Sequence, residues 1–362
     1  MKRISQDKRI GNTKLLFSSL LGLLCFGTLL AFTRSYPNNI LLKGVRTNQP
    51  KQVLWALNHG ANPNLLDPQT GSIPASSWKV LQKLQKLWYG HPLYKDAVPV
   101  LIEAIERNET TIVGYLLNKG ADANGVVPSH GKQESTPLME ATALGNDQIV
   151  HLLLQHRANP NSCNRKGYTA LDTAIWGTKE KIVELLLQQG ANPNYSPALR
   201  SPLSHATYIA ASAYDLLHSN AVPAQLRDHF NFAASMRIVQ LLLQHGARVN
   251  AQADTGRTPL TWACYFGCYP LARELLKAGA DPNLADGIGE APLSYAVMRR
   301  DVNLCRLLVR FGANPYHRDK SGIMAWETAT SFRDSALMQA LEEGLKEYRL
   351  NHSGGNRVSV VR

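Results

Sequence analysis

Short apolar stripes recur along most of the chain, and each has the spacing of one helix face. Three stripes read Ile-Val-x-Leu-Leu-Leu, at residues 149–154, 182–187 and 238–243. Leucines at 271, 275 and 276, and again at 304, 307 and 308, fill the equivalent places. Apolar residues at i, i+1, i+3 and i+4 form one broad face of a helix about three turns long. Each stripe therefore predicts a short amphipathic helix.

A five-residue motif, Gly-Ala-Asn-Pro-Asn, follows the stripes. Glycine can end a helix in a left-handed conformation, and proline prevents the helix from resuming. The last residues of successive copies are separated by 60, 37, 33, 56, 33 and 33 positions. A base period of 33 with three longer steps is typical of a stacked repeat protein. The full, near and looser copies are Gly60–Asn64, Gly120–Asn124, Arg157–Asn161, Gly190–Asn194, Gly246–Asn250, Gly279–Asn283 and Gly312–Tyr316.

A second, shorter helix is predicted upstream of each stripe. It begins with Thr or Ser, then Pro, then Leu, as in Thr136–Leu138 and Thr258–Leu260, with Ala in place of Pro at 170 and in place of Thr at 291. The hydroxyl caps the first backbone amides, and proline suits the first helical turn. Alanine recurs three residues after each Leu and lets neighbouring helices approach closely, at Ala141, Ala174, Ala206, Ala263 and Ala296.

These motifs together resemble ankyrin repeats. The resemblance implies an all-α fold, a curved solenoid of about seven helix-turn-helix units over residues 36–346 with a carboxy-terminal cap at Gly322–Leu345. A flexible tail is expected at 347–362. One departure is the residue after Thr-Pro-Leu, usually His in the family, which predicts less rigid loops. It is Met139, Asp172, Ser204, Thr261 and Ser294 here.

Two inserts break the period, near residues 65–98 and 209–232. The first is expected in the loop between two units, and the second between the two helices of one unit. The first contains Trp78, Leu81, Leu84 and Trp88, with lysines between them. This pattern predicts an amphipathic helix with a basic face that lies on a lipid surface or docks a partner. Packing against the side of the stack is an equally good interpretation.

The amino terminus has a basic segment at 1–14 followed by 18 uncharged residues from Leu15 through Leu24 to Phe32. A membrane-spanning helix needs about 17–25 apolar residues, whereas a signal peptide has a shorter run of about 7–15. The segment therefore favours an uncleaved single-pass anchor, with a secreted protein as the alternative. Basic residues before the run predict a cytoplasmic amino terminus in an inner membrane, with the repeats on the periplasmic side.

Composition and charge change this picture little. Hydrophobic residues make up 44% and charged residues 18%, as in a folded protein. The net charge is +12, but residues 1–34 carry +5 of it, and 33 basic against 26 acidic residues remain elsewhere. No nucleic-acid motif accompanies the excess, so no nucleic-acid partner is expected. The five scattered cysteines are interpreted as structural thiols, with Cys264 and Cys268 on one helix.

No catalytic pattern is present in the sequence. It lacks His-Glu-x-x-His, Gly-x-Ser-x-Gly and a glycine-rich phosphate loop ending in Lys-Ser or Lys-Thr. A non-enzyme with no metal or cofactor is therefore expected.

The resemblance implies that a partner protein contacts the loop tips and the exposed, concave side of the first helices. Aromatic and arginine side chains dominate such contact surfaces. Asp254 and Thr255 share one loop tip with Arg257, and the alternative for Trp262 and Tyr295 is burial between units. The candidate partner-binding residues are Arg165, Lys166, Trp176, Arg257, Trp262, Tyr265, Phe266, Tyr295, Met298 and Arg299.

The sequence thus predicts a membrane-anchored, non-catalytic scaffold that binds another protein. By analogy of fold and location, bacterial proteins of this kind include immunity proteins that neutralise a secreted toxin. One alternative is an exported effector of an intracellular bacterium that binds a host protein. Another is an enzyme regulator or hydrolase that uses the inserts.

Overall fold

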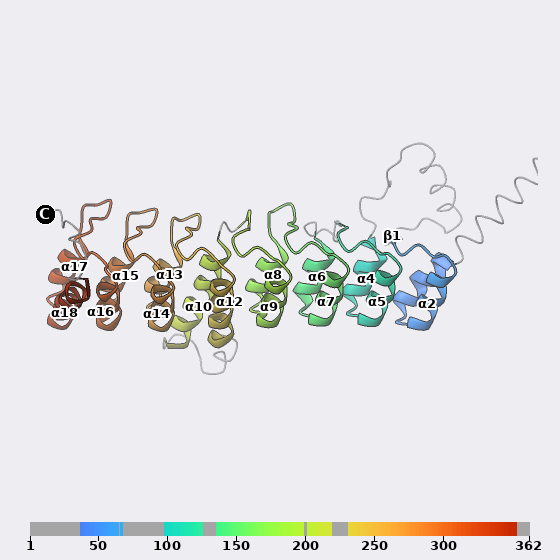
Figure 1. Ribbon diagram of the computed structural model, residues 1–362, viewed down its shortest axis with the longest axis horizontal. Helices are drawn as coiled ribbons and strands as arrows, with labels where there is room; N and C mark the ends of the chain where they lie inside the picture. Colours follow the sequence, from blue (N-terminus) through green and yellow to red (C-terminus); the bar gives the residue numbers. More distant parts are fainter. Residues whose placement is uncertain are drawn as a thin grey trace, which may run out of the picture. The chain divides into compact units, whose positions relative to one another are not determined.

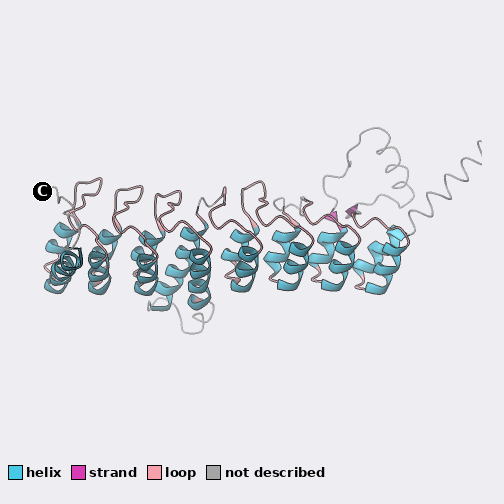
Figure 2. Cartoon of the chain, viewed as in Figure 1, coloured by secondary structure: helices cyan, strands magenta, loops and turns pink. Residues whose placement is uncertain are grey.

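The computed structural model describes residues 37–64, 66–67, 98–125, 135–198, 201–218 and 231–352 (Figure 1). It divides into two compact units, residues 1–158 and 159–362. Within each unit, pairs of antiparallel helices follow one another, joined by loops that project from one side (Figure 2). The expected all-α ankyrin-type architecture is confirmed.

The first unit begins with a helix over residues 37–46. A two-residue antiparallel pair brackets the first insert, with Leu66 opposite Pro99 and Asp67 opposite Val98. These strands are a small addition to the expected helical fold. The named elements are α2 (Pro50–Asn58), β1 (Leu66–Asp67), β2 (Val98–Pro99), α4 (Val100–Glu106), α5 (Thr110–Asn118), α6 (Pro137–Leu144) and α7 (Asp147–Gln155).

The second unit contains the longest described helices. The first helix of each pair packs on the first helix of the next, and most of the second helices follow in the same way. The elements are α8 (Ala170–Trp176), α9 (Glu180–Gln188), α10 (Pro202–His218), α12 (Phe232–Gln244), α13 (Pro259–Tyr265), α14 (Tyr269–Lys277), α15 (Pro292–Met298), α16 (Val302–Arg310), α17 (Ala325–Ser331) and α18 (Ser335–His352).

Helix ends follow the expected local chemistry. Thr136 and Thr258 accept hydrogen bonds from backbone amides three residues on, at 3.2 and 3.1 Å. The motif glycines that end the second helices adopt the left-handed conformation, with φ between 82° and 93°. Arg157, which replaces glycine in one copy, adopts it too, at φ 64°. The motif therefore ends helices as the sequence predicts.

The last asparagine of the motif has a further role that the sequence did not indicate. Asn194 donates from Nδ2 to the Gly246 carbonyl at 2.9 Å and accepts from the Arg248 amide at 2.8 Å. Asn283 makes the same two bonds to the next repeat, with the Gly312 carbonyl and the Asn314 amide. Each such side chain therefore braces two adjacent repeats.

Asp172 supplies hydrogen bonds where the family has histidine. Its Oδ2 accepts from the Thr169 amide and hydroxyl, at 2.8 and 2.9 Å, and from the Ser196 hydroxyl at 2.9 Å. The side chain is buried, and burial raises the pKa of this carboxyl above its ordinary value. At this position the loss of histidine does not remove the hydrogen bonding of the loop, because aspartate replaces it.

Three features of the helices differ from the sequence prediction. Residues 209–218 of the second insert continue α10, so this part of the insert is helical. Helix α18 runs to His352, six residues into the expected tail. Cys264 and Cys268 do not share a helix, because Cys264 lies in α13 while Cys268 is the N-cap of α14.

The buried cysteines behave as packing residues. Cys264, Cys268 and Cys305 are buried, and Cys163 is half-buried. Burial raises the pKa of Cys268 to about 12 and that of Cys264 well above its ordinary value. These thiols therefore stay protonated at neutral pH, as structural cysteines do.

The membrane segments of the sequence prediction lie outside the described residues. This holds for Leu15, Leu24 and Phe32, and for the amphipathic helix with Trp78, Leu81, Leu84 and Trp88. Within the described ranges, no helix combines the length and apolar character needed to cross a bilayer.

Candidate functional site

One large side chain is exposed at the same position of four consecutive first helices in the second unit. The position is the fifth residue after the Leu of the capping motif, and it holds Trp176 in α8, Tyr208 in α10, Tyr265 in α13 and Met298 in α15. Their exposed fractions are 56%, 39%, 40% and 47%. Because α8 packs on α10, α10 on α13 and α13 on α15, the four side chains follow the stack in order.

A second row of rings lies beside the first. It occupies the second residue after the same Leu, with His205, Trp262 and Tyr295. Trp176 lies 4.3 Å from His205 between ring centroids, Tyr208 lies 4.9 Å from Trp262, and Tyr265 lies 5.5 Å from Tyr295. Phe266 contacts both Tyr208 and Trp262, at 5.6 and 6.1 Å. We call these eight residues the aromatic strip: Trp176, His205, Tyr208, Trp262, Tyr265, Phe266, Tyr295 and Met298.

Arg257 supports the strip from its loop-tip side. Its guanidinium lies 4.5 Å from the Trp262 ring centroid and 4.7 Å from that of Tyr265. It also pairs with the buried carboxylate of Asp286 at 3.3 Å, and the Tyr295 hydroxyl donates to the same carboxylate oxygen at 2.6 Å. Burial and this bond raise the pKa of Tyr295 to about 12. Arg257 thus fixes the rings by stacking and has its charge balanced by Asp286.

His205 is an uncharged member of the strip. Its Nε2 atom is buried and has no hydrogen-bond partner. Burial lowers the pKa of His205 to about 4, so the imidazole is neutral at physiological pH. The ring therefore contributes flat aromatic surface between Trp176 and Tyr208.

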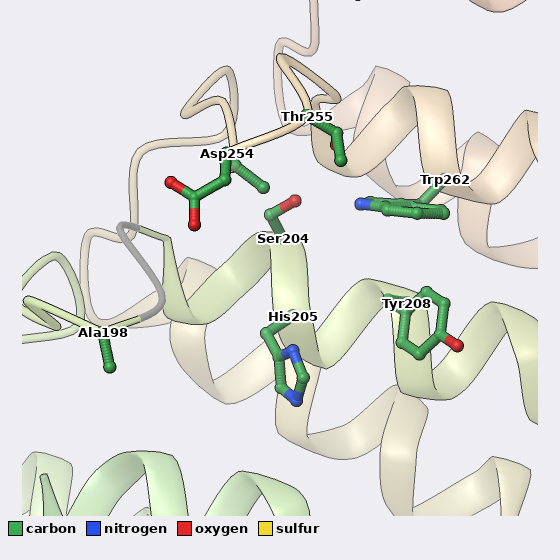
Figure 3. Close-up of a pocket in the computed structure, with 8 residues that line it drawn as sticks. Ala198, Ser204, His205, Tyr208, Asp254, Thr255 and Trp262 are labelled. Carbon is green, nitrogen blue, oxygen red and sulfur yellow. The ribbon is translucent and has the colours of Figure 1, made fainter. Parts of the chain in front are cut away.

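A pocket of about 250 Å³ opens in the middle of the strip, between α10, α13 and two projecting loops (Figure 3). Ser204, His205 and Tyr208 line it from α10, and the indole nitrogen of Trp262 points into it from α13. Asp254 and Thr255 stand at the loop side, as Figure 3 shows. Small-molecule sites usually measure about 300–1,000 Å³. This pocket is smaller, and its size suits one amino-acid side chain.

The structure brings most of the predicted partner-binding residues together, in different roles. Trp176, Trp262, Tyr265, Phe266 and Met298 all belong to the aromatic strip. Tyr295 is 7% exposed, so the alternative interpretation of burial holds for it. Trp262 is half-buried, with its nitrogen edge in the pocket.

The remaining predicted residues are not members of the aromatic strip. Arg299 donates to the Tyr265 carbonyl at 3.2 Å and pairs with Asp215 of the α10 extension at 2.8 Å. Its side chain thus ties α15 to α13 and α10. Arg165 and Lys166 are exposed on the loop before α8, outside the strip.

Sequence reasoning missed His205 and Tyr208. Both lie in α10, where the insert made the repeat look irregular from residue 209 onward. The signal that could have found them is the register from Leu203, which places them at the same two positions as Trp262 and Tyr265 in α13.

Family models cover more than half of the chain. A model described as ankyrin repeats in three copies matches residues 101–196 and 216–286, and a single ankyrin-repeat model matches 289–320. The chain belongs to the ankyrin-repeat family. Most of the repeat motifs identified in the sequence fall within the matched ranges, while Gly60–Asn64 and the helix start at Ser201–Leu203 lie outside them.

Similar proteins of known description share short stretches with this chain. It is 41% identical over 69 residues to the 2-5A-dependent ribonuclease of Mus musculus, a match covering 19% of the chain and 9% of that protein. It is 37% identical over 76 residues to the probable E3 ubiquitin-protein ligase XBOS34 of Oryza sativa subsp. japonica, covering 21% and 14%. The matches thus span a small part of each relative.

Solved ankyrin domains reproduce the fold over much of the chain. The human ASB11 ankyrin repeat domain has a TM-score of 0.50 at 23% identity, covering 67% of this chain and 96% of that one. The ankyrin repeat domain of Bcl-3, an IkappaB-family member, has a TM-score of 0.52 at 25% identity, covering 74% and 97%. Ankyrin-repeat domains bind other proteins, and this chain is a protein–protein interaction module of that type.

Ankyrin folds are typically non-catalytic scaffolds. In the part of the chain that the structure describes, no cluster of three or more His, Cys, Asp or Glu side chains is arranged to hold a metal ion. The concentration of exposed aromatic surface makes the strip the candidate functional site.

Proposed function

We propose that the chain captures a partner protein on the aromatic strip and does so without catalysis. The observation that carries the proposal is the recurrence of one large exposed side chain per repeat on four consecutive helices. Random surface hydrophobes are scattered singly, whereas a contiguous apolar row marks an interaction site. Trp, Tyr and Arg, the residue types that carry most binding energy, form this row and its support.

We further propose that the repeats are held at a membrane surface. Residues 15–32 anchor the chain, and about seven residues separate Phe32 from the start of the repeats at Ile40. The basic residues before the anchor hold its amino terminus in the cytoplasm. The repeats then face the periplasm, where the partner is a secreted toxin that the chain neutralises.

A site-specific crosslink tests the capture. A photoreactive residue replaces Tyr265 on the strip, and the matched control replaces Trp55, which is equally exposed on α2 in the first unit. We expect a discrete crosslinked species from position 265 in intact cells and none from position 55. The species should disappear when Trp176→Ala is added, because that change removes the most exposed ring of the strip. Equal crosslinking from both positions would contradict the proposal.

Two further measurements separate the finer parts of the proposal. Mass spectrometry of the crosslinked species distinguishes a toxin from a host protein or an enzyme under regulation. Protease treatment of spheroplasts tests the orientation, and digestion of the repeats is the expected result. Complete protection of the repeats would refute the periplasmic placement while leaving partner capture intact.

A further inference from the structure

The spacing of the strip limits what lies along it. Packed helices have axes about 8–10 Å apart. Trp176, Tyr208 and Tyr265 stand on successive packed helices, so exposed rings recur along the stack at about that interval. A polyproline II segment rises about 3.1 Å per residue with three residues per turn, or about 9 Å per turn. An α-helix presents one face every seven residues, about 10.5 Å apart. Both shapes fit by length alone.

Hydrogen-bond donors on the strip distinguish the two shapes. Among the described residues, the indole N–H of Trp262 and the hydroxyls of Tyr208 and Tyr265 make no hydrogen bond to another part of the protein, so they are open to a ligand. The Trp262 nitrogen points into the pocket (Figure 3). Carbonyls of an α-helix are already bonded within the helix, whereas those of a polyproline II segment are free. The donors therefore match an extended backbone.

Charge on the strip also favours an uncharged ligand. Arg257 is balanced by Asp286 at 3.3 Å, and Arg299 by Asp215 at 2.8 Å. The imidazole of His205 is neutral. No lysine or arginine is among the described residues that line the pocket. This balance gives no cationic surface for an anionic lipid or a nucleic acid, and it suits a segment built from proline and apolar residues.

We infer that the aromatic strip binds a proline-rich segment of the partner in the polyproline II conformation, with one apolar side chain per turn. The pocket lined by Tyr208 and Trp262 takes one of these side chains, and the Trp262 N–H donates to a backbone carbonyl beside it. Aromatic-lined grooves recognise such segments because the ligand is already extended and loses little entropy on binding. The inference rests on the proposed function and names the chemistry of its partner.

Three fluorescein-labelled peptides of equal length test the inference against the full chain in detergent. They are four repeats of Pro-Pro-Leu, four repeats of Gly-Gly-Leu, and an alanine-rich helix-forming peptide with Leu at every seventh position. We expect saturable binding of the Pro-Pro-Leu peptide by fluorescence anisotropy. It should bind at least about tenfold tighter than the flexible Gly-Gly-Leu peptide, since preorganisation lowers the entropic cost.

Conservative variants locate the contact. Trp262→Phe keeps a smaller aromatic ring and removes the N–H, and it should weaken binding of the Pro-Pro-Leu peptide about tenfold, because a buried carbonyl loses its donor. Trp55→Phe in α2 is the matched control and should change nothing. Unchanged circular dichroism of both variants would show that the fold is kept.

Several outcomes overturn the inference. These are equal binding of the Gly-Gly-Leu peptide, tightest binding of the helical peptide, no binding of any peptide, or full affinity in Trp262→Phe. If the position-265 crosslink to a partner still forms in any of these cases, the proposed function stands and the polyproline II ligand alone is refuted. Loss of both the crosslink and peptide binding would refute the two together.

Discussion

Arg157 shows how much stability is lost when a non-glycine residue occupies the left-handed position of the repeat motif. It holds φ 64° where the motif glycines hold 82–93°. A left-handed conformation costs a side-chain-bearing residue about 1–2 kcal/mol, and the extra chain entropy of glycine returns about 0.5–1 kcal/mol of that. We therefore expect Arg157→Gly to stabilise the chain by about 0.5–1 kcal/mol. Chemical denaturation of the full chain measures it.

The control for this prediction is Arg248→Gly. Arg248 is also an exposed arginine of a motif copy, but its φ is not positive. Glycine there adds chain entropy and relieves no strain, so stability should fall. If both variants lose stability, backbone strain at Arg157 is not the explanation.

His205 makes the free energy of unfolding depend on pH. Its folded pKa of about 4 lies below the ordinary value of 6.5, so protonation favours the unfolded state. This contribution is fully present above about pH 6.5 and is lost as the pH falls toward 4. Integrated over that window, it amounts to about 3 kcal/mol as an order of magnitude. Urea denaturation of the wild type between pH 7 and 4.5 should show the loss.

His205→Phe keeps a flat ring and removes the titrating group. The wild type should lose stability relative to this variant as the pH falls through the same window. Parallel pH profiles for the two proteins would mean that His205 does not titrate at a lowered pKa.

At the residue scale, sequence patterns predicted residues whose role is local. Thr258 caps its helix because the capping bond joins residues three apart, which the sequence displays directly. The Asp286–Arg257 pair and the partnering of Asn194 with Gly246 were not predicted, since they join residues 29 and 52 positions apart. His205 and Tyr208 were missed because their helix runs into an insert.

Helix α10 is the element that departs most from the repeat. Its extension beyond residue 209 is held at Asp215 by Arg299, at 2.8 Å, and Arg299 also bonds the Tyr265 carbonyl. The pair is partly exposed, so breaking it should cost less than about 1 kcal/mol of global stability. Arg299→Ala should instead speed hydrogen exchange in residues 210–218, because local opening depends on this tie.

Arg306→Ala is the matched control for Arg299→Ala. Arg306 pairs with Glu343 at 3.1 Å with similar exposure, but on α16 and α18, away from the α10 extension. The two variants should lose similar stability, and exchange in residues 210–218 should change in Arg299→Ala alone. Unchanged exchange there in both variants would mean that the extension is held by its packing, such as the Tyr214–Phe232 contact at 5.2 Å.

At the element scale, the sequence predicted most helices because apolar period and caps lie within each helix. The α10 extension has neither the family motif nor a cap at its expected end, so the period break was interpreted as a loop. The extra turns of α18 were missed although Leu341, Leu345 and Tyr348 keep a helical spacing, because the polar, glycine-containing residues beyond them were interpreted as part of a flexible tail.

At the scale of the whole molecule, stability of a repeat stack is a sum over neighbouring repeats. In the second unit, α18 covers α16 with Leu337, Ala340 and Leu341, all fully buried. Leu341→Ala should cost about 2–5 kcal/mol, as for other fully buried leucines. Because α18 is the last described helix, the loss should appear as fraying of that end.

Hydrogen exchange read by mass spectrometry separates fraying from cooperative loss. In Leu341→Ala, protection should fall in α17 and α18 and, less, in α16, while α8 and α9 keep theirs. Leu186→Ala in α9, equally buried, is the control and should lower protection in α8, α9 and the neighbouring α12. A uniform fall in protection across the second unit in both variants would contradict the nearest-neighbour picture. In that case the aromatic strip, which is built on α8 to α15, should lose peptide binding in Leu341→Ala although the substitution lies in α18. If only the end of the stack frays, peptide binding should survive Leu341→Ala.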